Sequence, residues 1–215
     1  MLSSPWIAWA LVVTSVLVVL AYEWRAYRIG ERSPERTART AHARLRQSWV
    51  QAMSGQPGFE IVAVQALRNS LMSATISAST AALAVMGAIT LAGSSVAATL
   101  GHWSMVDALP TLLRVLMVAV LFASYVCSAM AMRYLGHASY VMSMPVSSPQ
   151  RQALNSAAGE QVRRAGLLYS WGLRLFLIVA PIVAGIVHPL AMLPATLLLL
   201  VALHYFDQPS GSEAG

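Results

Sequence analysis

The chain has 215 residues, of which 57% are hydrophobic and only 10% are charged. Soluble domains carry roughly 25% charged residues, and here the apolar residues form long uninterrupted runs, so an ordinary soluble domain is excluded and an integral membrane protein is indicated. The net charge of +6 comes from arginine alone, because the chain has no lysine. Cys127 is the only cysteine, which excludes a disulfide framework and a cysteine-based zinc site.

The first apolar run predicts a transmembrane helix over about 6–22, with aromatic residues at both ends as at membrane interfaces. Arginines follow this run instead of preceding it, so we expect a retained helix and not a signal peptide. The polar segment 23–58 comes next and holds seven arginines. Within it, Ser33 and Pro34 mark a helix start, and apolar residues recur at helical spacing over 33–53. We expect a basic amphipathic cytoplasmic helix there, either lying on the anionic leaflet or packed against the ends of the spans.

A second transmembrane helix is expected over about 68–93. Small residues recur every four positions along it, which is the pattern that lets helix backbones approach closely. We therefore expect this helix at the centre of the bundle or at an oligomer contact. A short loop over about 94–108 follows, with Asp107 as the expected N-cap of the next helix.

Three further spans are expected over about 109–135, 166–187 and 190–206. The polar stretch 141–165 between the first two of them is expected to be a loop, and 208–215 a disordered tail. The predicted fold class is therefore all-α: a polytopic helical bundle of about five transmembrane helices plus the basic amphipathic helix.

Loop charge predicts the orientation of this single domain, residues 1–207. The segments 23–58 and 141–165 together carry ten arginines, whereas the loops expected on the opposite side carry none. By the positive-inside rule the N-terminus is outside and the C-terminus is in the cytoplasm of a bacterial inner membrane. The expected partners are anionic lipid headgroups and either further copies of the chain or other membrane proteins. Nucleic acid is not expected, because no nucleic-acid-binding fold is visible.

Four short motifs stand in a fixed order relative to the apolar runs: RQSW at 46–49, ALRNSLM at 66–72, RYLGHASY at 133–140 and GLRLF at 172–176, the last followed by Pro181. In this order and placement they resemble a family of small bacterial and plant membrane proteins known only as domain of unknown function 599. The resemblance covers about 20–207. It implies a helical bundle and brings no established chemistry, so it supplies no site residues.

Arg174 stands inside the apolar run 166–187, which contains no Asp or Glu. It lies roughly 12 Å beyond Gly166 at 1.5 Å per residue, and a centred arginine costs about 2.5–3.5 kcal/mol to insert. Its side chain must therefore find acceptors inside the bundle. These are either protein groups (backbone carbonyls, hydroxyls of the second span, Tyr125) or an anion or lipid phosphate, which guanidinium binds bidentately.

Arg68, Asn69 and Arg114 are the further candidates for contacts with an anion or a lipid. Arg68 and Asn69 are expected at the inner interface and Arg114 near the outer face. With Arg174, the two arginines would form a series of charges at different depths without a buried carboxylate, which suits an anion route.

His137 and His204 are weak candidates for haem or metal binding, because both are expected near the inner surface on different helices. No histidine spacing of a known metal site supports them, so no cofactor is expected.

Enzyme signatures are absent, since the chain has no Walker loop, no GxGxxG, no GxSxG and no paired membrane carboxylates. We expect a non-catalytic membrane protein, an accessory or scaffold component that packs against membrane partners through its small-residue helix. The alternative is a homo-oligomeric anion channel or transporter that uses its intramembrane arginines. A weaker alternative is a haem- or metal-binding membrane protein.

Overall fold

The computed structural model describes residues 5–33, 37–101 and 105–208. For residues 94–101 and 105–107 it describes the backbone only. In these ranges the chain forms six helices and no strand: α1 (Pro5–Arg32), α2 (Ala38–Ser54), α3 (Glu60–Gly101), α4 (Met105–Met142), α5 (Pro149–Val187) and α6 (Pro189–Asp207). All but α2 contain a segment long and apolar enough to cross a membrane, which confirms the predicted all-α bundle.

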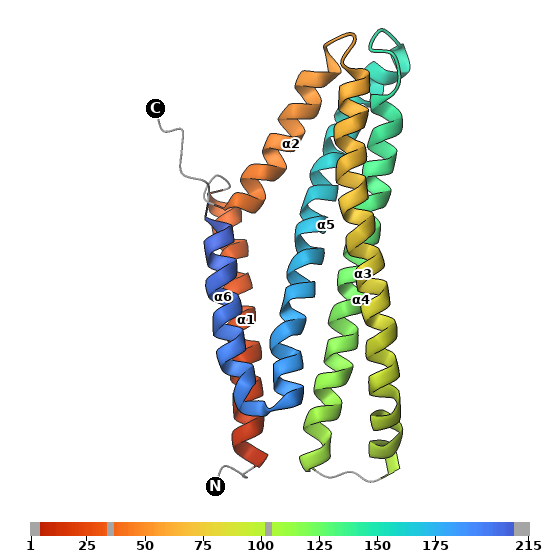
Figure 1. Ribbon diagram of the computed structural model, residues 1–215. Helices are drawn as coiled ribbons and strands as arrows, with labels where there is room; N and C mark the ends of the chain where they lie inside the picture. The colour runs from red at the N-terminus through yellow and green to blue at the C-terminus, as the bar shows by residue number, and fades with distance from the viewer. Residues whose placement is uncertain (1–4, 34–36, 102–104, 209–215) are drawn as a thin grey trace.

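The helices divide the molecule into two halves along its length. With 42, 38 and 39 residues, α3, α4 and α5 are roughly 57 to 63 Å long, about twice the hydrocarbon thickness of a bilayer. The 19 residues of α6 span only about 28 Å, which is one bilayer. Figure 1 shows α1 and α6 beside the lower half of α5 and α2 beside its upper half. We name the lower half the membrane half and the upper half the extension.

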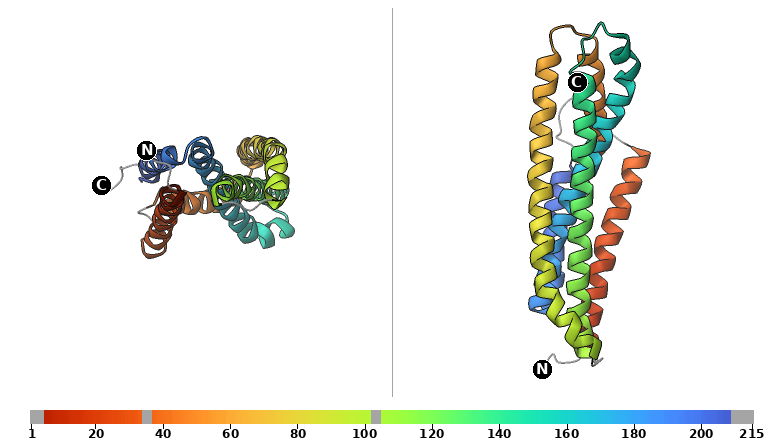
Figure 2. Two further views of the ribbon diagram at one scale, coloured as in Figure 1. Left: turned by 90° about the horizontal axis from the view of Figure 1, so that it is seen from below. Right: turned by 90° about the vertical axis from the view of Figure 1, so that its right-hand side faces the viewer.

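Each half has its own apolar core. In the extension, α2, α3, α4 and α5 bury Val50, Leu67, Leu135 and Val162 among others. In the membrane half, α1 and α6 replace α2, and the core includes Val12, Leu113, Met117, Ile182 and Met192. Because α3, α4 and α5 run through both cores, they hold the two halves in one elongated bundle, which Figure 2 shows from two further sides.

The polar stretch 141–165 is largely helical, so the predicted loop there is wrong. Helix α5 begins at Pro149, and Ser148 is its N-cap, whose hydroxyl accepts a hydrogen bond from the Arg151 backbone N–H at 3.3 Å. Serine followed by proline is a standard helix start. Hydropathy does not reveal this part of α5, because its first turns are polar, as expected for a helix that begins outside the bilayer.

A buried arginine stabilises the turn between α4 and α5. The side chain of Arg151 is fully buried, and its Nη1 donates hydrogen bonds to the carbonyl oxygens of Met142 at 2.7 Å and Met144 at 2.5 Å. These carbonyls lie at the C-terminal end of α4, where helix carbonyls lack partners within the helix. Arg151 therefore satisfies carbonyl groups at the end of α4 and carries no evident ligand role.

Helix α2 begins later than expected and runs alongside α5. Its first residue is Ala38 and its N-cap is Thr37, so the predicted start at Ser33 is wrong; Pro34 lies outside the described residues. The Ser33 backbone N–H instead donates to Ile29 and continues α1. Helix α2 packs along the N-terminal half of α5, as the packed alternative predicts.

The small-residue helix α3 lies at one side of the bundle and not at its centre. It packs mainly on α4, and its contacts with α5 are few. Its buried small residues, Ala74, Ala81 and Ala88 among them, allow this close packing within the chain. Helix α3 also continues to Gly101 and α4 begins at Met105, so the predicted loop 94–108 is too long and Asp107 is not the N-cap.

The division into two halves predicts where water reaches the helices. In a Cys127→Ala background, Asn69→Cys and Gln152→Cys, both exposed on the extension, should react with a membrane-impermeant maleimide in lipid nanodiscs. Ile89→Cys and Leu198→Cys, exposed on the membrane half, should not react, because a thiol needs water to form the reactive thiolate. Protection of Gln152→Cys to the same degree as Leu198→Cys would show that the bilayer covers the extension.

Candidate functional site

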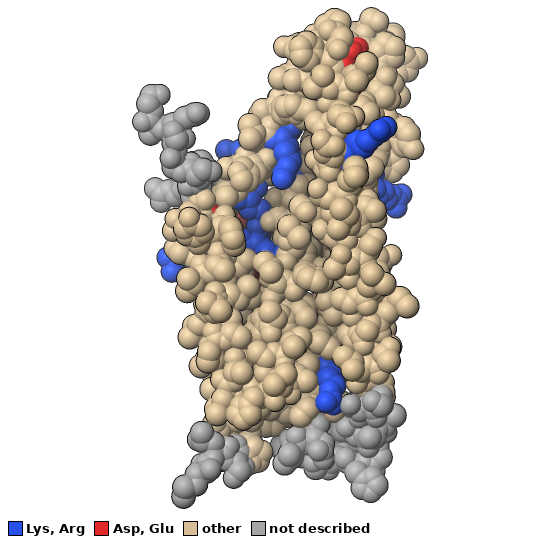
Figure 3. Space-filling view, in the orientation of Figure 1, with Lys and Arg blue, Asp and Glu red and all other residues tan. Residues whose placement is uncertain are grey.

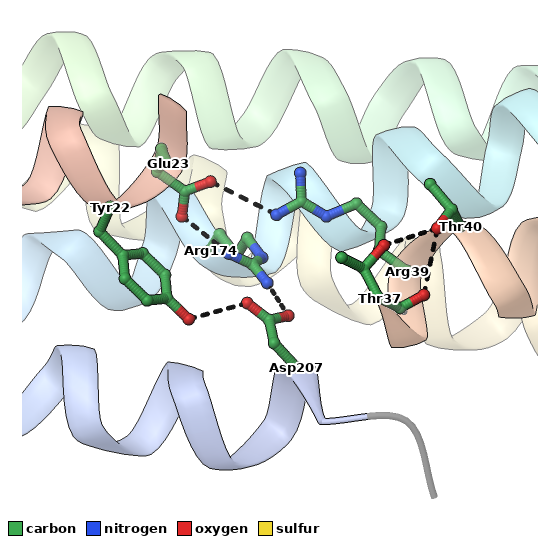
Figure 4. Close-up of polar contacts among 7 residues, drawn as sticks. All are labelled: Tyr22, Glu23, Thr37, Arg39, Thr40, Arg174 and Asp207. Atoms are coloured by element: carbon green, nitrogen blue, oxygen red, sulfur yellow. Dashed lines mark hydrogen bonds and ion pairs between the residues drawn. The ribbon is translucent and has the colours of Figure 1, made fainter. Parts of the chain in front are cut away.

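Arg174 forms ion pairs with carboxylates from two other helices. Its Nη1 donates to Oε1 of Glu23 on α1 at 2.7 Å, and its Nη2 donates to Oδ1 of Asp207 on α6. The Tyr22 hydroxyl donates to the other oxygen of Asp207 at 2.9 Å (Figure 4). Arg174 is only 6% exposed, and the expectation that no carboxylate meets it is wrong.

The cluster lies at one boundary of the membrane half and not at the bilayer centre. Asp207 is the last residue of α6, so about 28 Å of helix separates it from the turn between α5 and α6. Glu23 directly follows the apolar run of α1, and the next exposed aromatics are Trp24 and Tyr27. Arg28 stacks over Trp24 at 4.9 Å. Aromatic and basic residues together mark a membrane interface, so Arg174 lies near the lipid headgroups.

Arg39 joins α2 to this cluster. Its Nη2 lies 3.4 Å from Oε2 of Glu23, and its guanidinium stacks on the Trp171 ring of α5 at 4.5 Å. Burial lowers the pKa of Arg39, and the neighbouring charge of Arg174 lowers it further, whereas Glu23 acts in the opposite direction. Because guanidinium is effectively always protonated in proteins, Arg39 stays charged. Two arginines therefore share one glutamate.

A cavity of about 320 Å³ opens beside the cluster, between α2, α5 and α6. Arg39, Arg46 and Arg174 line it together with His42 and Asp207. Arg39 and Arg174 pair with two carboxylates, Glu23 and Asp207, so among these five groups the positive charge of Arg46 remains. Figure 3 shows basic side chains gathered mainly in the upper half of this face, whereas the described part of the lower half is mostly uncharged.

Arg46 carries this remaining charge. Within the part of the chain that the structure describes, no carboxylate lies within ion-pair distance of it. Its guanidinium crosses α5 at Gly166, where a Cβ atom would collide with Nη1 of Arg46. Packed atoms take the place of water around it and lower its pKa, and the nearby Tyr169 opposes this shift. The residue is still exposed to the cavity, so its donors are free to bind an anion.

The other residues predicted for a site lie elsewhere. Arg68 and Asn69 are exposed on the extension. Arg114 is half-buried and lies near the N-terminal end of α4, in the membrane half. The cavity beside Arg174 includes none of these three residues. The structure therefore does not gather the predicted series of arginines around one cavity.

The two candidate histidines are also apart from Arg174. His137 is exposed on the extension, and His204 is exposed at the end of α6, 3.5 Å from the amide nitrogen of Gln208. Among the described residues, no three His, Cys, Asp or Glu side chains are grouped to hold a metal ion. The two histidines thus gain no support from the geometry.

The comparison with known families identifies the chain's relatives. Residues 10–212 match the family described as protein of unknown function, DUF599. The chain belongs to this family. No curated protein and no solved structure gives a significant match to this DUF599 protein.

The ion pairs of Arg174 predict a large stability difference between charge variants. Arg174→Gln leaves Asp207 without its cation and leaves Glu23 with Arg39 as its one remaining arginine partner among the described residues. Removing one partner of a largely buried ion pair costs roughly 3–5 kcal/mol, so the melting temperature in detergent should fall by roughly 6–20 °C. Arg114→Gln, the same change at a half-buried position outside the cluster, should shift it by less than about 4 °C, because partly exposed charges contribute at most about 1 kcal/mol.

A charge-balanced cluster is the further control for this prediction. Arg174→Gln combined with Asp207→Asn removes the uncompensated carboxylate and keeps the ion pair of Glu23 with Arg39, so part of the lost stability should return. A double variant less stable than Arg174→Gln alone would contradict the ion-pair explanation.

Proposed function

We propose that this DUF599 protein is a non-catalytic membrane protein that binds the phosphate of an anionic lipid beside Arg46. Its arginine-rich extension faces the cytoplasm of a bacterial inner membrane, in accordance with the positive-inside rule. The observation that carries the proposal is the guanidinium of Arg46, which lines a cavity at headgroup height with no carboxylate partner among the described residues.

A phosphate suits the donors around this cavity. Guanidinium presents a planar pair of N–H groups that binds phosphate bidentately. Tyr169 and Ser170 on α5 and His42 on α2 line the same cavity and add hydroxyl and imidazole groups. The positive charge left by three arginines and two carboxylates matches the single negative charge of a phosphodiester.

A lipid suits the cavity better than a free anion. Its wall on the side of the membrane half is apolar and consists of Leu177 on α5 with Leu203 and Phe206 on α6. The two halves of the cavity wall thus match the two parts of a lipid, a charged headgroup above and hydrocarbon below. A free phosphate would leave the apolar wall without a partner.

The scaffold and pore alternatives have weaker support from the geometry. A scaffold role relied on the small residues of α3, but several of them, such as Ala81 and Ala88, pack within the chain. An anion pore relied on an unneutralised charge at Arg174, which two carboxylates now compensate. The lipid proposal needs neither feature.

The proposal predicts that Arg46 selects anionic lipids. Delipidated protein titrated with phosphatidylglycerol in native mass spectrometry should bind one lipid per chain more tightly than phosphatidylcholine. Arg46→Gln should weaken the binding of phosphatidylglycerol about tenfold or more, because a charge-assisted hydrogen bond contributes roughly 1.5–3 kcal/mol.

Arg44→Gln is the matched control, because Arg44 is exposed on the same helix and does not line the cavity. It should retain phosphatidylglycerol binding within about twofold. Equal losses in both variants would mean that the net charge of α2, and not the site at Arg46, attracts the lipid.

A further inference from the structure

Arg46 also lines a second cavity, on the opposite side from the first. This cavity has a volume of about 300 Å³ and lies between α2, α3, α4 and α5. It shares Arg46, Gly166 and Tyr169 with the first cavity, and among the described residues that line it Arg46 is the only charged one. Most of the other lining residues are apolar: Trp49, Ala66, Leu67, Leu135, Val162 and Ala165. An apolar pocket of this size with a few polar groups at one side is typical of a small-molecule site.

The second cavity lies in the extension. Its residues on α5 run from Val162 to Tyr169, which places them roughly 8 to 18 Å beyond Arg174 along the helix axis. Arg174 itself lies at the boundary of the membrane half. The lipid tails of the bilayer therefore end below this cavity, and its apolar wall needs a different apolar partner.

The packing of α2 explains why the cavity exists. Helix α2 packs along α5 but makes few contacts with α3. The space between α2 and α3 is consequently left open at the side, with Trp49 on one edge and Ser70 and Ser73 on the other. Residues 70 and 73 are exposed, and their hydroxyl groups bond to the backbone of α3 itself.

We infer that this second cavity holds the apolar chain of a single-chain amphipathic anion, such as a fatty acid or an alkyl phosphate, whose headgroup binds Arg46. The inference rests on the proposed anion site at Arg46 and adds a second class of ligand to it. The volume of about 300 Å³ equals about ten water molecules at roughly 30 Å³ each. Because a methylene group occupies a similar volume, the cavity accepts one medium-length chain and not the two chains of a diacyl lipid.

The main variant of the test fills the cavity and keeps Arg46. Protein in phosphatidylcholine nanodiscs is titrated with 11-(dansylamino)undecanoate, and dansyl fluorescence is compared with that of empty nanodiscs. The wild type should show saturable binding. Ser70→Phe places an aromatic ring in the cavity and should weaken binding at least about tenfold, whereas its neighbour Asn69→Phe, exposed and outside the cavity lining, should bind within twofold of the wild type. Arg46→Gln should also weaken the binding, because it removes the headgroup partner.

The outcomes separate this inference from the proposed function. If Ser70→Phe binds the dansyl probe like the wild type, or if the wild type shows no saturable binding, the inference is overturned. The lipid site would still stand if phosphatidylglycerol binding depends on Arg46. If Ser70→Phe loses phosphatidylglycerol as well as the probe, the cavity holds a chain of a diacyl lipid and the single-chain assignment is wrong. Ala66→Leu, a smaller filling at an exposed position, gives the same test if Ser70→Phe does not fold.

Discussion

The ion pairs of Arg174 determine how the two terminal helices join the rest of the bundle. Helix α1 packs mainly on α6 and otherwise makes few contacts. Its apolar packing alone therefore determines its position along the bundle axis only weakly. Arg174 on α5 binds Glu23 of α1 and Asp207 of α6 at one level. At a membrane boundary with low dielectric, each of these charges is costly without its partners. A shift of either helix along its axis would separate an ion pair, so the cluster fixes the register of α1, α5 and α6.

This register produces the cavity beside Arg46. Because Arg174 uses both carboxylates and Arg39 shares Glu23 with it, the acidic groups of the region are already engaged. Helix α2 then brings a third arginine, Arg46, across Gly166 of α5. Among the described residues, the cluster that neutralises Arg174 therefore leaves Arg46 without a counter-ion. The proposed anion site thus depends on how the charges of three helices are distributed and not on any single motif.

The sequence predicts the fold class and the number of spans well, because both depend on hydropathy that is local along the chain. It does not predict the partners of Arg174, since Glu23 and Asp207 are 151 and 33 residues away and only the packing of three helices brings them together. One signal was present: both carboxylates stand at the ends of apolar runs. Hydropathy also places Arg174 too deep, because it does not reveal that the polar stretch before Gly166 is the first half of α5.

Arg46 differs from two arginines of α5, Arg151 and Arg174, in the partners of its side chain. Arg151 is buried and donates to two backbone carbonyls, and Arg174 is buried and binds two carboxylates. The chain itself thus supplies acceptors to both guanidinium groups, although the buried Nε of Arg151 has no hydrogen-bond partner among the described residues. Arg46 is held against Gly166 at the junction of two cavities, and among the described residues it has neither kind of partner. This difference is the reason that the anion proposal is placed at Arg46 and not at Arg151 or Arg174.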